Sequence, residues 1–239
     1  IEQDVVGVYD LFGKVKWRNG QVKIDSGNPT VYYYITHSLL KGQPVLQINY
    51  AFWYSGRYGE NSPGIERGPL DGVTFRVTFD PGGGPIMVDI MNNCGCYHFY
   101  VPRNQRVERV LSIPMAIDAF VPTGLPDDFP AKRLTIRVIS GWHQVANIDA
   151  RTVPVDFIPY HLEPYQRLEM LPKNDTHHES MFTARGIGKH PKRIESDIFI
   201  PMGVPQVGRM RQRGHHAIKF VGRAHFDDPH LFDKHFEFE

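Results

Sequence analysis

The residues best suited to chemistry in this sequence are Cys94, Cys96 and His98, which lie within the segment 93–98. They are spaced two residues apart. If a strand beginning near Ile86 continues through them, all three side chains project from one face. Two thiols and one imidazole are ligands suited to zinc or copper. We therefore expect them to belong to a zinc or copper site, with a fourth ligand supplied from elsewhere in the fold.

The Cys-x-Cys spacing puts a geometric condition on this interpretation. Alternate residues of a flat strand lie about 6.6 Å apart along it. Two sulfurs bound to one zinc ion lie only about 3.8 Å apart. The cysteines must therefore lean together, and Gly95 between them allows the backbone to bend. A metal site predicts a bend at Gly95.

A second group of potential ligands lies near the C-terminus, where the sequence contains His215, His216, His225 and Asp227. Adjacent histidines on a strand face opposite ways, so only one of the first two can join a given site. His225 and Asp227 form a close His-x-Asp pair, and we expect them to contribute further metal ligands. If such a site kept an open coordination position, metal-dependent hydrolytic or redox chemistry would follow.

Two other functions fit the same residues. Cys96 could be the nucleophile of a cysteine hydrolase if His98, His143 or His37 served as its base. The chain could instead be a non-catalytic recognition or structural β-domain. In that case both cysteines would be ordinary buried residues, or would be joined in a tight disulfide bridge.

Charge and hydropathy exclude several classes of partner. The formal net charge is +1, so nothing draws the whole molecule to nucleic acid or to an anionic membrane. Residues 185–223 carry nine Lys and Arg against two Asp and Glu, but no nucleic-acid-binding motif accompanies them. No apolar run is long enough to span a bilayer. The sequence begins with Ile1, which we interpret as the start of a processed product, and we expect a periplasmic or secreted location.

The elements that position these residues are expected to be strands. Aromatic residues are abundant, with 15 Phe and 11 Tyr, and 22 Gly and 19 Pro indicate many turns. We predict a single all-β domain over 1–239, a sandwich or barrel of about seven to nine short strands with long loops. The region 159–196 reads as an irregular insertion, 55–72 as a long loop, and the residues after Asp228-Pro229 as a short C-terminal helix. The predicted strands cover residues 31–35, 45–53, 73–79, 86–90, 134–139, 153–158, 197–200 and 217–221.

Overall fold

The centre of the protein is a six-stranded sheet in a computed structural model that describes residues 1–112, 118–151, 157–198, 200–202, 206–216 and 226–239. The strand order is β12-β4-β5-β6-β7-β8, antiparallel throughout except for the parallel pairing of β12 with β4. Its strands are rich in β-branched and aromatic residues, which favour a pleated surface. They are β4 (Thr30–Leu40), β5 (Gln43–Arg57), β6 (Gly68–Phe79), β7 (Pro85–Asn92), β8 (Phe99–Pro102) and β12 (His161–Pro164).

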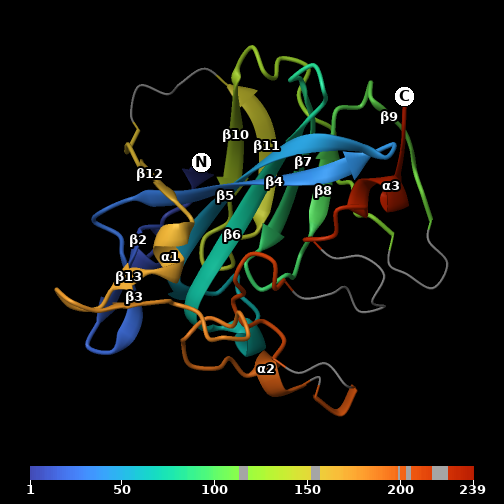
Figure 1. The fold of residues 1–239 in the computed structure, drawn as a ribbon. Helices are drawn as coiled ribbons and strands as arrows, with labels where there is room; N and C mark the ends of the chain where they lie inside the picture. The colour runs from blue at the N-terminus through green and yellow to red at the C-terminus, as the bar shows by residue number, and fades with distance from the viewer. Residues whose placement is uncertain (113–117, 152–156, 199, 203–205, 217–225) are drawn as a thin grey trace.

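One face of this sheet packs against a smaller, three-stranded sheet (Figure 1). The smaller sheet contains β1 (Glu2–Gln3), β10 (Arg133–Val138) and β11 (Val145–Arg151). Phe52 and Phe75 of the central sheet share a buried cluster with Ile136 and Ile148 of the smaller one. The two sheets therefore form a sandwich closed by an apolar core.

The opposite face of the central sheet is covered by the C-terminal third of the chain, drawn in orange and red in Figure 1. Trp53 packs there with Leu168 of α1 (Gln166–Glu169) and with Met210. Tyr100 packs with Phe232 of α3 (Leu231–His235). This covered face carries the candidate site.

The remaining elements are short and lie around the sandwich. Six short strands form three two-stranded sheets, and four single helical turns lie in the connections between strands. They are β2 (Lys14–Arg18) with β3 (Gln21–Asp25), β9 (Val107–Val110) with β15 (Phe236–Phe238), β13 (Leu171–Pro172) with β14 (His178–Glu179), and the turns η1 (Val8–Asp10), η2 (Gly64–Glu66), α2 (Glu195–Ile198) and η3 (Ile200–Met202).

The all-β class and the short C-terminal helix are confirmed, while several details differ from the expectation. The described chain has fifteen strands rather than seven to nine, because many are only two to five residues long. The predicted strand at 197–200 is wrong: Asp197 and Ile198 belong to the helical turn α2, and Ile200 begins the helical turn η3. The strands predicted at 217–221 and over most of 153–158 fall outside the described residues. None of the helices in the described ranges is long and apolar enough to cross a membrane.

The loop expected over 55–72 is shorter than predicted. Pairing between β5 and β6 continues to its last pair, Arg57 with Gly68, so the connection contains only residues 58–67 and the turn η2. Ladder hydrogen bonds to a neighbouring strand outweigh the low strand propensity of Gly and Pro here. The extension matters because it brings Arg57 to the end of the sheet.

Candidate functional site

The two cysteines lie in the tight turn that joins β7 to β8. β7 ends at Asn92, and the backbone bends at Gly95, whose φ is 89°. The Asn92 N–H donates to the carbonyl of Cys96 at 3.0 Å, and the Gly95 N–H donates to the carbonyl of Asn92 at 2.7 Å. The expected bend is present, but the expectation that the strand continues through Cys94 and Cys96 is wrong. The turn brings the thiols together.

Asn93 fastens this turn to the sheet. Its side-chain oxygen accepts a hydrogen bond of 2.7 Å from Thr74, and its side-chain nitrogen donates to the carbonyl of Phe52 at 3.2 Å. Its backbone N–H donates to the carbonyl of Gly72 at 2.8 Å. A Cβ atom at position 72 would lie 2.3 Å from the Asn93 side-chain nitrogen, so only glycine allows this approach. Asn93 thereby fixes the position of Cys94.

The two sulfurs interact with each other and with buried cations. Both cysteines are free; Cys94 is buried and Cys96 is half-buried. The pKa of Cys94 is lowered by a hydrogen bond from Cys96 and, against the cost of burial, by the guanidiniums of Arg57 and Arg193. The pKa of Cys96 is raised because its proton is held in that bond and because the thiol is buried. Within the pair, Cys94 is therefore the sulfur that ionises first.

Arg211 adds a third guanidinium near the sulfurs. Its backbone N–H donates to the carbonyl of Asn93 at 2.7 Å, which holds it against the turn. Burial lowers the pKa of its guanidinium, while the charges of Cys94 and Cys96 act in the opposite direction. Its Nε is buried and has no hydrogen-bond partner among the described residues. A negatively charged sulfur nearby offsets the free-energy cost of burying this guanidinium.

Arg57 is held in place by two carboxylates. Its Nε and Nη2 donate to the two oxygens of Asp71, each at 3.0 Å, and its Nη1 donates to Glu66 at 2.5 Å. Glu66 also accepts from Tyr97 at 2.5 Å and from Trp142 at 3.1 Å. Since Arg57 is almost completely buried, this two-pronged pairing fixes both the position and the charge of the guanidinium.

His143 lies behind Arg57 and is paired with two buried carboxylates. Its Nδ1 donates to Asp71 at 2.7 Å, and its Nε2 lies 3.5 Å from Asp10, a distance typical of an ion pair rather than of a strong hydrogen bond. Its ring stacks on Tyr54 with 3.9 Å between the ring centroids. Although burial lowers the pKa of His143, the bonds to Asp10 and Asp71 outweigh it and the net shift is upward. His143 supports the arginine network and is not positioned as a base.

Arg193 connects the C-terminal segment to the same network. Its Nη2 donates to the Leu70 carbonyl at 2.5 Å and to Asp71 at 3.2 Å, and its Nη1 lies 3.5 Å from Glu195. Its Nε and Nη1 make no hydrogen bond to the described residues. Burial raises the pKa of Glu195, so this carboxylate balances Arg193 only weakly at low pH.

His98 and Asp227, which are also predicted as metal ligands, have other partners. The His98 side chain is 4% exposed, its Nε2 lies 2.7 Å from Asp89, and its ring lies 5.3 Å from that of Phe226. Asp227 accepts hydrogen bonds from the backbone and the ring of His216, both at 3.0 Å. His225 lies outside the described residues. In the parts of the chain that are described, no three His, Cys, Asp or Glu side chains are grouped to hold a metal ion.

The hydrolase alternative required an imidazole beside Cys96. In the described structure the charged and polar partners of Cys96 include Cys94, Arg57 and Glu195. His143 is engaged by two carboxylates, and His37 is exposed on β4. The pKa is lowered for Cys94 and raised for Cys96, so Cys94 rather than Cys96 is the more acidic thiol.

Sequence analysis did not identify the arginines of this site. Arg57 and Asp71 lie at the two ends of what reads as a loop, and Arg193 and Arg211 lie in a basic stretch that reads as solvated. No local pattern links them to Cys94, since they are brought together by strand pairing and by the path of the C-terminal segment.

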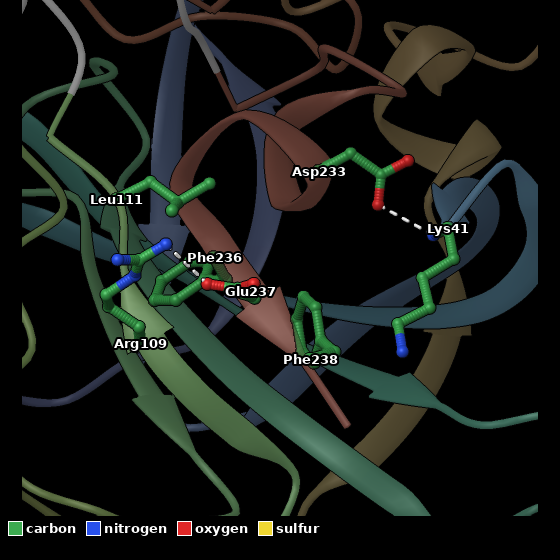
Figure 2. A pocket seen from close by; sticks show the side chains of 7 residues that line it. All are labelled: Lys41, Arg109, Leu111, Asp233, Phe236, Glu237 and Phe238. Atoms are coloured by element: carbon green, nitrogen blue, oxygen red, sulfur yellow. Dashed lines mark hydrogen bonds and ion pairs between the residues drawn. The ribbon is translucent and has the colours of Figure 1, made fainter.

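A surface pocket of about 410 Å³ lies apart from the thiols, between β9, β15 and the turn at Lys41 (Figure 2). Phe236 and Phe238 contribute rings to it. Asp233 accepts the backbone N–H of Lys41 at 2.7 Å, and Arg109 pairs with Glu237 at 2.7 Å. Its acidic groups are thus already paired, and nothing in it indicates a ligand.

Comparison with known proteins does not assign the chain to a family. A scan against protein-family models, a search of curated proteins and a search of solved structures each found no match.

Proposed function

We propose that Cys94 and Cys96 form a redox-active thiol pair that alternates between a dithiol and a disulfide. The observation that carries the proposal is the tight turn at Gly95, which places both cysteines in one buried cluster. The guanidiniums of Arg57 and Arg193 help to lower the pKa of Cys94 there. A thiolate is the reactive form of cysteine, and neighbouring cations stabilise it. A second thiol in contact with the first can resolve the oxidised product.

The oxidant class that fits this site is a hydroperoxide. The Cys94 thiolate attacks one peroxide oxygen, the O–O bond breaks, and the released alkoxide or hydroxide takes up a proton. The resulting sulfenic acid of Cys94 is attacked by the sulfur of Cys96. The S–O bond breaks, water leaves with the Cys96 proton, and the disulfide forms. An external dithiol supplies the two electrons that restore the reduced pair.

Burial limits which oxidants can reach the pair. Cys94 is only 2% exposed, whereas Cys96 is half-buried. A hydroperoxide as small as hydrogen peroxide can enter such a site, and a folded protein disulfide cannot. The bend at Gly95 supplies the backbone conformation that a bridge between near neighbours requires.

Treatment with hydrogen peroxide and mass spectrometry test the proposal. In the native protein, about one equivalent of peroxide should remove both thiols and produce a disulfide within the peptide containing Cys94 and Cys96. In Cys96→Ser, oxidation should stop at a sulfenic acid on Cys94 that a dimedone probe traps. Cys94→Ser should react far more slowly. If both native thiols survive peroxide that oxidises them in the denatured protein, the pair is structural and the proposal fails.

A further inference from the structure

We infer that a second pocket on the covered face of the central sheet binds a neutral, hydroxyl-rich ligand of the size of a simple sugar. The pocket has a volume of about 310 Å³ and lies where β4, β5 and β6 meet residues 213–214 and 226–228. This volume is at the lower end of the range of small-molecule sites. The inference does not depend on the thiol chemistry.

Uncharged hydrogen-bonding side chains line the sheet side of this pocket. Thr36 donates to the side-chain oxygen of Gln47 at 3.1 Å, and the Gln47 nitrogen donates to Thr78 at 3.1 Å. The Asn49 nitrogen donates to the Thr36 hydroxyl at 2.9 Å. Because each group is bonded to the next, the orientation of both amides is fixed.

One side-chain atom of Asn49 has no hydrogen-bond partner among the described residues. Its side-chain nitrogen is used by Thr36 and by the carbonyl of Tyr34, at 2.9 and 3.3 Å. Its Oδ1 has no partner in the described structure, although the residue is fully buried. Asn49 lines the pocket, and a buried acceptor without a partner is costly, so a donor that reached this atom from the pocket would be favoured. A ligand hydroxyl is such a donor.

The charges of the pocket favour an uncharged ligand. Each charged Arg or Asp side chain that lines it is already paired with a neighbour in the described structure, so none of these four is left as a counter-ion for a charged ligand. The pairs are Arg76 with Asp89, Arg213 with Glu169, Asp227 with His216 and Asp228 with Lys234.

Aromatic rings complete the match to a sugar. Tyr34 and Phe226 both line the pocket and supply apolar surface next to the amides and the hydroxyl. The guanidinium of Arg213 lies 5.5 Å from the centre of the Tyr34 ring, which adds a fixed donor near the same wall. A sugar has apolar C–H faces and a ring of hydroxyl groups. A site with aromatic rings and hydrogen-bonding side chains can contact both, and it binds a ligand that has these hydroxyls much more tightly than one that lacks them.

Isothermal calorimetry with free sugars tests the inference. The probes are glucose, galactose, mannose and N-acetylglucosamine, with glucuronate and glucose 6-phosphate as charged comparisons. At least one neutral sugar should bind with a Kd of about 1 mM or tighter. Its charged counterpart should bind about tenfold more weakly or not at all, because the charge would lose hydration without gaining a partner.

Substitutions in the pocket lining test whether the sugar binds in this pocket. Asn49→Leu should weaken the binding of that sugar by about tenfold or more, since the acceptor is lost. Thr36→Val removes a half-buried hydroxyl from the same network. If Asn49→Leu does not fold, Thr36→Val serves in its place and should also weaken the binding of that sugar. Leu46→Thr, at an exposed position of β5 outside the pocket lining, should leave the Kd unchanged. The inference is overturned if no neutral sugar binds, if only the charged sugars bind, or if the folded pocket variants bind as well as the natural protein.

Discussion

His143 donates its Nδ1 proton to Asp71 over 2.7 Å at a position where both side chains are fully buried. The same carboxylate receives two hydrogen bonds from Arg57, which faces the thiols. A histidine far from Cys94 in the sequence is thus linked to it through one carboxylate and one guanidinium. Four predictions follow from this network and from the turn it supports.

The stability of the protein should depend on the ionisation of His143. The folded-state pKa of His143 lies above its unfolded value of about 6.5. Its stabilising effect is therefore complete below about pH 6.5 and is lost as the pH rises through the folded pKa. Against the cost of burial, cations and hydrogen bonds hold the pKa of Asp71 far below its usual range, so Asp71 stays ionised over this interval.

Urea unfolding at pH 6 to 9 of the natural protein and of His143→Gln measures this effect. The natural protein should be more stable by about 3 kcal/mol at pH 6, because the variant removes the cation that buried Asp10 and Asp71 share, although Asp71 keeps Arg57 and Arg193. This difference should shrink steadily toward pH 9. A difference that stays constant over the range would show that His143 is neutral in the folded protein.

Gly72→Ala should destabilise the fold by about 2 kcal/mol or more, through overpacking at the turn that carries the cysteines. The new methyl group would lie 2.3 Å from the Asn93 side chain and 2.6 Å from the carbonyl of Phe52. Gly64→Ala is the matched control, since nothing lies within 4 Å of a Cβ there. The midpoint temperature of thermal unfolding should fall in Gly72→Ala and stay unchanged in Gly64→Ala. Equal midpoint temperatures in the two variants would contradict the tight packing of Asn93.

Arg211→Met should raise the pKa of the Cys94 thiol by removing a nearby positive charge. The rate of thiol loss to hydrogen peroxide at pH 7 should fall by about tenfold, and the pH at which this rate reaches half its maximum should move upward. Arg185→Met, at an exposed position, is the control and should react like the natural protein. An unchanged pH profile in Arg211→Met would mean that the guanidinium does not act on the sulfurs.

Elemental analysis distinguishes the proposed redox-active thiol pair from the zinc or copper site that the sequence predicts. That site remains a prediction for Cys94, Cys96, His98, His225 and Asp227. The guanidiniums beside the two sulfurs repel a divalent cation, so protein purified without added metal should hold less than about 0.3 equivalents of any transition metal. About one equivalent, lost on Cys94→Ser substitution, would favour the metal site over the redox pair.

The sequence by itself determined the all-β class, the positions of most central strands, the short C-terminal helix and the bend at Gly95. These features follow from local patterns: strand-forming residues in runs, turn residues between them, and a glycine flanked by two cysteines. It also identified Cys94 and Cys96 as the residues most suited to chemistry.

Only the tertiary structure decided what surrounds those sulfurs. Arg57 reaches them because β5 pairs with β6 to its last residues, and Arg193 and Arg211 reach them because the C-terminal segment crosses the sheet. The structure also separated His98, which binds Asp89, from the thiols. Contacts between residues distant in sequence depend on strand register and on packing of the whole chain. The spacing of residues along a single strand cannot show whether a pair of cysteines faces a metal ion or a group of arginines.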